Sequence, residues 1–163
     1  MLYDQALEQI NKAFATHLMA EMAICQGPKD ELLKKRNFFL NILENTKSKD
    51  SSGQEWVEWP MVCSTVGEIL IPEDVKTSLG FDETIKEVET IFLFHLMLES
   101  IQNPDKTDKL IERHNDILED LKQKKGKDAT GKDIMVWSDV CYALGEFLIN
   151  KEWEKDCNKT KKQ

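Results

Sequence analysis

The sequence predicts an all-α fold built from two copies of a three-helix unit. Apolar residues recur at steps of three and four along most of the chain, which is the spacing of a helix face. No run alternates apolar and polar residues beyond a few positions, so strand signals are absent. The segment 53–71 returns as 131–149, and the match extends over 3–71 and 81–149 with about a third of positions identical. We interpret the chain as a tandem duplication.

The first repeat, 3–71, is expected to hold three helices. Its first helix is indicated by Leu7, Ile10 and Phe14 on one face. Gly27-Pro28 ends that helix, because glycine suits the left-handed C-terminal cap and proline cannot continue a helix. The three helices are expected at about 3–25, 30–45 and 53–71, with a polar loop at 47–52.

The third helix of each repeat is expected to begin at a capping signal. Ser52-Gly-Gln-Glu55 is a capping-box pattern, and Thr130-Gly-Lys-Asp133 is its looser counterpart in the second repeat. Pro60 falls within the first two turns, where a missing amide costs least. The pattern favours a helix start over a phosphate-binding loop, because it contains too few glycines.

The second repeat, 81–149, follows a link at 72–80. Its helices are expected at about 82–102, 107–124 and 130–149, and the last extends through Trp153 before the tail 150–163 ends. Each repeat alone is near the size at which a core is marginal. We therefore expect the repeats to share one core, as a single six-helix domain over 1–163 with a pseudo-two-fold axis.

Composition excludes several classes of function. The formal net charge is −8 over 163 residues, and phosphate binding depends on Lys and Arg, so nucleic acid is not an expected partner. No apolar run reaches the roughly 18 residues needed to cross a bilayer, and no signal peptide is evident in 1–18. The four cysteines lack CxxC spacing, as in proteins that keep reduced thiols in the cytoplasm.

A histidine and a glutamate fall within the apolar face of the first helix in each repeat. These pairs are His17 with Glu21 and His95 with Glu99. Burying a carboxylate is costly unless the group is paired or binds a metal. Three interpretations stay open: a His–Glu pair, within or across repeats, that fixes helix register; a ligand or metal site; and a pair at an open edge.

A metal site would draw on a definite set of ligands. The spacing differs from the Glu-x-x-His signature of di-iron carboxylate bundles, although the number of histidines and glutamates matches. A helical wheel also places Glu68 opposite the buried side of its helix, where it would face solvent or a partner. No cofactor is expected, and a divalent metal is the alternative. The candidates would be His17, Glu21, His95 and Glu99, with Glu68 and Glu146 completing the set.

Cysteine and glycine share a helix face in the third helix of each repeat. Cys63 precedes Gly67 by four residues, and Cys141 precedes Gly145 by four. Small residues at this spacing allow another helix to approach closely, and a buried free cysteine behaves as a small apolar group. We therefore predict a packing role for both cysteines rather than a reactive one.

The tryptophans and two asparagines have separate predicted roles. Trp59 and Trp137 recur on the buried side of their helices and are expected in the core. Trp153 lies beyond the repeat in a polar stretch, which is typical of a contact residue. Asn37 and Asn115 are expected to face inward and to satisfy a carbonyl or the His–Glu pair.

We expect a non-enzymatic, acidic, intracellular protein-binding module of the inhibitor, immunity or adaptor type. No catalytic triad order, Walker loop, dinucleotide fingerprint, HExxH or EF-hand loop occurs. The expected partner is a protein with a basic surface, and the chain is expected to be a monomer or a homodimer. The alternative is a metal- or small-ligand-binding bundle that uses the duplicated His-x-x-x-Glu pair. The candidate binding residues are His17, Glu21, His95, Glu99, Glu68, Glu146 and Trp153.

Overall fold

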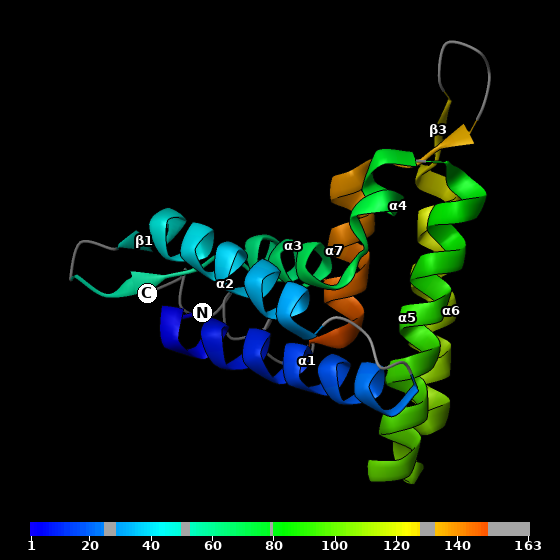
Figure 1. Ribbon diagram of the computed structural model, residues 1–163, viewed down its shortest axis with the longest axis horizontal. Coiled ribbons are helices and arrows are strands. Elements are labelled where there is room, and N and C mark those ends of the chain that lie inside the picture. The colour runs from blue at the N-terminus through cyan, green and yellow to red at the C-terminus, as the bar shows by residue number, and fades with distance from the viewer. Residues whose placement is uncertain (25–28, 50–52, 79, 128–132, 150–163) are drawn as a thin grey trace.

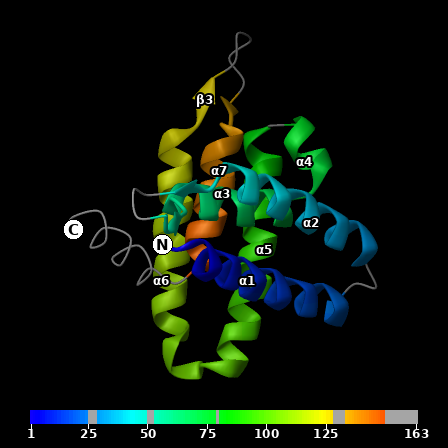
Figure 2. The same ribbon diagram turned by 90° about the vertical axis from the view of Figure 1, so that its left-hand side faces the viewer.

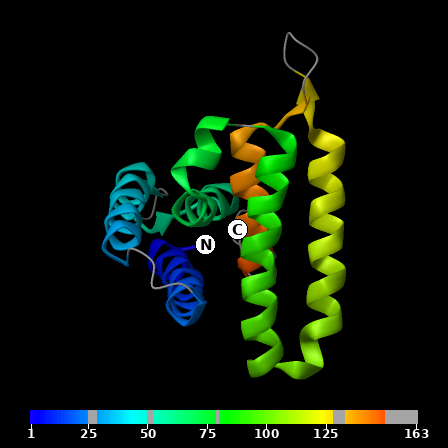
Figure 3. The same cartoon turned by 45° about the vertical axis from the view of Figure 1, so that its right-hand side comes forward.

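The structure, a computed structural model, describes residues 1–24, 29–49, 53–78, 80–127 and 133–149. Two helical hairpins flank a central pair of helices, and the hairpins run crosswise to one another (Figure 1). Figures 2 and 3 show the same arrangement from two further directions. The hairpins are α1 (Tyr3–Ile24) with α2 (Lys29–Thr46) and α5 (Phe81–Gln102) with α6 (Thr107–Lys124), and the central pair is α3 (Trp59–Leu70) and α7 (Trp137–Leu148).

The all-α class predicted from the sequence is confirmed. The four helices of the two hairpins begin and end close to their predicted bounds. Helices also begin at matching positions of 3–71 and 81–149: α1 begins at Tyr3 and α5 at Phe81, and α3 begins at Trp59 and α7 at Trp137. Within the described ranges, none of the helices has the length and apolar character required to cross a bilayer.

Several short elements differ from the prediction. A helix, α4 (Glu73–Ser78), occupies the segment expected to be a plain link, and a 3-10 turn, η1 (Pro104–Lys106), joins α5 to α6. The expectation that the chain has no strands is wrong at two antiparallel ribbons. These ribbons pair β1 (Ser48–Lys49) with β2 (Glu55–Trp56), and β3 (Gly126–Lys127) with β4 (Asp133–Ile134).

The ribbons explain why the predicted start of the third helix in each repeat is wrong. Lys47 Nζ lies 2.8 Å from a Glu55 carboxylate oxygen, and Lys125 Nζ lies 3.1 Å from Asp133 Oδ2. The carboxylates expected in the capping boxes therefore stabilise the ribbons. Helix α3 begins only at Trp59, with proline in its first turn, where the fixed φ of proline suits a helix start.

The end of the last helix differs as well. Helix α7 spans Trp137–Leu148, and its C-cap, Ile149, has an extended backbone. The predicted start near 130 and the predicted run of the helix past Ile149 are therefore both wrong. The predicted continuation through Trp153 falls at 150–163, which lies outside the described residues, as do Ser52 and Thr130 of the capping signals.

The central helices α3 and α7 pack at backbone contact through two glycines. A Cβ on Gly67 would overlap the carbonyl oxygen of Cys141, and a Cβ on Gly145 would overlap that of Cys63. Both cysteines are buried and free. The predicted close approach of a second helix is confirmed, and each glycine admits the backbone of the helix that carries the other.

Each hairpin is attached to the end of one central helix. Lys35 on α2 donates through Nζ to the carbonyl oxygen of Ile71, directly after α3. Arg113 on α6 donates to the carbonyl oxygen of Ile149, directly after α7, at 3.1 Å. Such bonds satisfy carbonyls that a helix end leaves unpaired. Buried apolar side chains of both repeats then form one continuous core around α3 and α7.

Replacement of Gly145 by alanine tests the contact between α3 and α7. Alanine favours a helix over glycine by about 1 kcal/mol, so propensity alone predicts a more stable protein. Because the new methyl group overlaps backbone, we expect Gly145→Ala instead to lower the free energy of unfolding by about 2 kcal/mol or more, measured by urea denaturation.

Gly80→Ala is the matched control, because a Cβ there meets only Glu83 Oε2, at 3.5 Å. We expect this variant to stay within about 0.5 kcal/mol of the parent protein. A Gly145→Ala protein as stable as the parent would contradict the close contact.

Candidate functional site

The two histidines of the predicted pairs meet where α1 and α5 contact each other. His17 is 2% exposed and His95 is 4% exposed. Their rings are stacked, with centroids 5.7 Å apart and planes 12° from parallel. The expectation that both histidines lie on the buried side of their helices is confirmed, and the structure brings these residues of the two repeats together.

The glutamates of the same pairs lie at the edge of this contact rather than inside it. The side chain of Glu21 is 29% exposed, and its Oε1 is 3.6 Å from His17 Nε2. Glu99 accepts a hydrogen bond from Asn103 Nδ2, at 3.0 Å, beyond the end of α5. Of the three open interpretations, a His–Glu contact at an open edge fits His17 and Glu21. Glu99 turns towards the C-cap of its own helix.

Burial keeps both imidazoles neutral near pH 7. Burial lowers the pKa of His17 to about 4. Burial, and secondly the neighbouring His17, lower the pKa of His95 to about 3. Among the described side chains, His17 Nδ1 and His95 Nε2 have no hydrogen-bond partner. A neutral imidazole can bind a metal through an in-plane lone pair. Because the two rings are nearly parallel, their lone pairs do not converge on a point between them.

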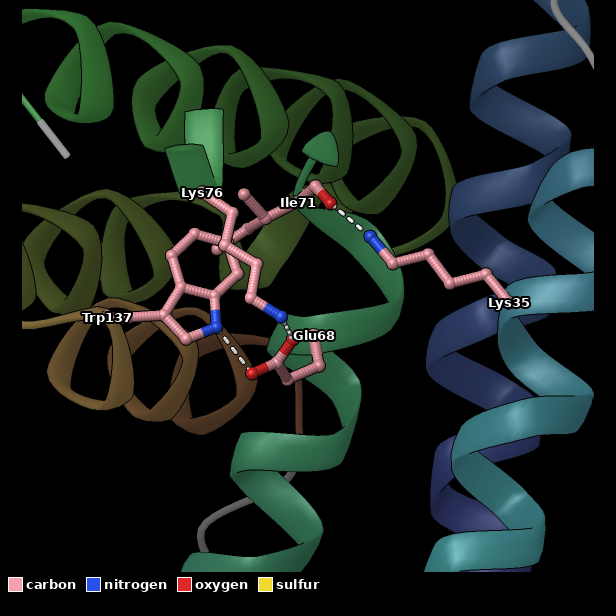
Figure 4. Close-up of polar contacts among 5 residues, drawn as sticks. All are labelled: Lys35, Glu68, Ile71, Lys76 and Trp137. Carbon is pink, nitrogen blue, oxygen red and sulfur yellow. Dashed lines mark hydrogen bonds and ion pairs between the residues drawn. The ribbon is translucent and has the colours of Figure 1, made fainter. Parts of the chain in front are cut away.

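A second polar cluster surrounds Glu68 on α3 (Figure 4). The indole N–H of Trp137 donates to Glu68 Oε1. Lys76 Nζ lies 3.7 Å from Glu68 Oε2 and 5.5 Å from the centroid of the Trp137 ring. Glu68 is therefore half-buried and bound within the chain, whereas the helical wheel turns it towards solvent or a partner. The difference arises because α4, which the sequence did not predict, carries Lys76 to this carboxylate.

The Glu68 cluster also affects the nearer cysteine. Burial, and secondly the Glu68 carboxylate, raise the pKa of the Cys141 thiol. The nucleophile in cysteine chemistry is the thiolate, so a raised pKa leaves an inert side chain. This agrees with the predicted packing role of Cys141.

The six candidate ligands do not assemble into one centre. His17 and His95 lie between α1 and α5, whereas Glu68 binds Trp137 between α3 and α7. Glu146, on α7, is half-buried. Across the described part of the chain, no three His, Cys, Asp or Glu side chains are grouped so that they could hold a metal ion.

The remaining predicted positions divide between core and surface. Trp59 is buried as predicted, and Trp153 lies outside the described residues. The expectation that Asn37 and Asn115 face inward is wrong, because both are exposed. Each instead contacts the residue before it: Asn37 Oδ1 accepts from Arg36 at 3.0 Å, and Asn115 Oδ1 is 3.1 Å from His114 Nδ1.

The outer face of α5 carries large apolar side chains that the sequence analysis missed. Leu93 is 56% exposed, Met97 is 53% exposed and Ile101 is 76% exposed. These three residues, which we call the α5 stripe, follow one another at steps of four and so lie on one side of the helix. The sequence contains this pattern, because α5 has apolar residues on both of its faces. A helical wheel drawn to find the face that packs on the core draws attention to that face alone.

The helix that carries the α5 stripe is acidic. Helix α5 carries five carboxylates and one lysine. Glu89 lies one turn before the stripe, and Asp105 follows it in η1.

No protein-family model, curated protein or solved structure matches the chain. Function is therefore inferred from the arrangement of these residues alone.

The stacked histidines predict a loss of stability in acid. The unfolded chain takes up protons at about pH 6.5, whereas folding lowers the pKa of His17 to about 4 and of His95 to about 3. Their contribution is therefore complete above pH 6.5 and is lost as the pH falls below that value. We expect urea denaturation to show a decrease on the order of 4 kcal/mol between about pH 7.5 and pH 5.

Single variants assign this acid sensitivity to the stack. His17→Gln and His95→Gln should each remove about half of the pH dependence, since each removes one buried titrating ring. His114→Gln, which removes the histidine outside the stack, is the matched control and should keep the acid sensitivity of the parent. Equal pH dependence in all four proteins would contradict the role of the stack.

Proposed function

We propose that the protein is a non-enzymatic, acidic, cytoplasmic module that binds another protein, in the manner of an inhibitor, immunity protein or adaptor. The observation that carries this proposal is the α5 stripe, three large apolar side chains exposed on one helix face. Monomeric soluble proteins bury most such side chains, and apolar patches with a polar rim are typical of interaction sites. Because the chain is acidic, the partner has a basic surface.

Two features of the described residues support binding rather than catalysis. The buried histidines are neutral and stacked on each other. The Cys141 thiol is held protonated by burial. General acid–base and nucleophilic catalysis need groups that can exchange a proton or attack near neutral pH, in contact with a substrate.

A single domain of two duplicated halves underlies this proposal. In it, 3–71 and 81–149 descend from one ancestral unit and pack about a pseudo-two-fold axis between α3 and α7. Support comes from contacts that occur in pairs. Gly67 contacts Cys141, and Gly145 makes the equivalent contact with Cys63. Lys35 donates a hydrogen bond to the carbonyl oxygen of Ile71, and Arg113 donates one to that of Ile149.

Charge reversal on α6 tests the proposed function. Glu112, Asp116 and Glu119 are exposed on this helix. The affinity-tagged protein should retain a basic protein from an extract of its native cells. A triple variant that combines Glu112→Lys, Asp116→Lys and Glu119→Lys should retain less of that protein at low salt. Lys122→Ala, on the same helix, is the matched control. Retention of no protein in a charge-dependent manner would contradict the proposal.

The second candidate function is a metal- or small-ligand-binding bundle. It is favoured by the 5.7 Å approach of His17 and His95 and by their unpartnered ring nitrogens. Glu21, whose Oε1 lies 3.6 Å from His17 Nε2, would be the nearest carboxylate. The two rings would have to turn out of their parallel stack, and Glu99 away from Asn103, to reach the same ion.

Titration with Zn²⁺ tests this second function. If His17 and His95 bind a metal, protein purified without chelator should contain stoichiometric metal by elemental analysis, and the His95→Gln variant should lose it. Neutral imidazole is a common zinc ligand, so the titration should also shift the imidazole NMR signals of His17 and His95. Substoichiometric metal with no loss of stability on chelation would count against the bundle.

A further inference from the structure

The two repeats differ most informatively on the outer faces of α1 and α5. In the second repeat, residues at steps of four on and just after α5 read Glu89, Leu93, Met97, Ile101 and Asp105. The corresponding residues of the first repeat read Asn11, Ala15, Met19, Ala23 and Gly27. Only the central methionine is shared, so the first repeat lacks both the larger apolar side chains and the flanking carboxylates.

This divergence affects exposed positions, whereas the residues beneath them are retained. Ala15 and Ala23 are exposed on α1, as Leu93 and Ile101 are on α5. The buried pair, His17 and His95, is identical in the two repeats. Leu93 is 56% exposed and Ile101 is 76% exposed, so burial within the chain accounts for the smaller part of their apolar surface.

We infer that the α5 stripe binds one amphipathic helix of a partner, with basic residues at both ends of its apolar row. This inference rests on the proposed function and names its binding face. A straight row of side chains at steps of four is complementary to a similar row on another helix, since ridges of one helix fit grooves of the other. Methionine adapts well to such contacts, because it is unbranched and flexible.

Charge complementarity indicates why the partner helix is basic. Glu89 precedes the stripe and Asp105 follows it, so carboxylates lie at both ends of the apolar row. Glu89 lies eight residues before Met97 on α5, which is about 12 Å along a helix at about 1.5 Å per residue, whereas Asp105 lies in η1, beyond the last helical residue, Gln102. A partner helix therefore carries Lys or Arg roughly two turns from its central apolar residue on the side that faces Glu89, and a further basic residue at the end that faces η1.

The same comparison predicts one partner helix for each chain. If both repeats bound alike, a duplicated protein would bind two helices. The outer face of α1 has alanine at two of the three stripe positions, and Asn11 there already accepts a hydrogen bond from Arg36. At these three positions, only α5 carries a full row of large apolar side chains.

A designed peptide tests the inference with the full-length protein. The probe is an amphipathic helical peptide with leucines at steps of four and two lysines at each end. Fluorescence anisotropy should show saturable binding of one peptide per chain, weaker at high salt. Two control peptides, one with the leucines spread around the helix and one with glutamate in place of lysine, should bind at least about tenfold more weakly.

Variants assign the binding to the stripe. Leu93→Ser with Ile101→Ser should weaken peptide binding at least about tenfold, because these side chains form the apolar contact. Both residues are exposed, so the variant should keep the melting temperature of the parent within a few degrees. Met19→Ser, at the position of α1 that matches Met97, is the matched control and should bind as the parent does.

Each result bears on the inference separately from the proposed function. Equal binding by the stripe variant and the parent, or two peptides per chain, would overturn the inference. Tighter peptide binding by a chain that ends at Ile149 would also overturn it, because residues 150–163 would then be what covers the stripe. A concentration-dependent dimer that is lost in the stripe variant would overturn it as well, because a second copy of the chain would then cover the stripe. A stripe variant that still retains a basic protein from the extract would leave the proposed function standing and the inference refuted.

Discussion

The backbone contact between α3 and α7 is the constraint on which the rest of the structure depends. Gly67 and Gly145 bring these helices close enough for each glycine to meet the carbonyl group of a buried cysteine. No other residue type fits there, because any Cβ would overlap backbone. The C-terminal end of each central helix is then bonded by one hairpin, through Lys35 or Arg113. The close pair therefore determines where both hairpins lie.

The position of the hairpins determines the environment of the histidines. Helices α1 and α5 contact each other at His17 and His95, and both rings are almost fully removed from solvent. A charged imidazole there would lose its hydration and meet a second ring 5.7 Å away, so the neutral form is strongly favoured. Unpartnered ring nitrogens make the contact less stable than an apolar one of the same shape. The pair thus contributes stability only while it remains uncharged.

Much of this arrangement could be predicted from local sequence, and the rest depends on contacts between distant residues. Periodicity predicted the hairpin helices and the burial of His17, because both follow from the geometry of one helix. The strand ribbons could not be predicted in this way, since Glu55 suits a capping box equally well until Lys47 is known to lie beside it. Glu68 differs from its prediction for a similar reason, because Lys76 reaches it from a helix too short to show periodicity.

The exposed faces of α1 and α5 differ, although the buried histidines on the same two helices are identical. A change at Gly67 or His17 alters a contact with the other repeat, so both halves are constrained together at such positions. Exposed positions of α1 and α5 have no such contact, and each repeat can change there independently. Replacement of small residues by leucine and isoleucine on an exposed face adds apolar surface that water disfavours. A partner helix that covers the α5 stripe, as we propose, would remove that surface from water and would leave the contact between α1 and α5 unchanged.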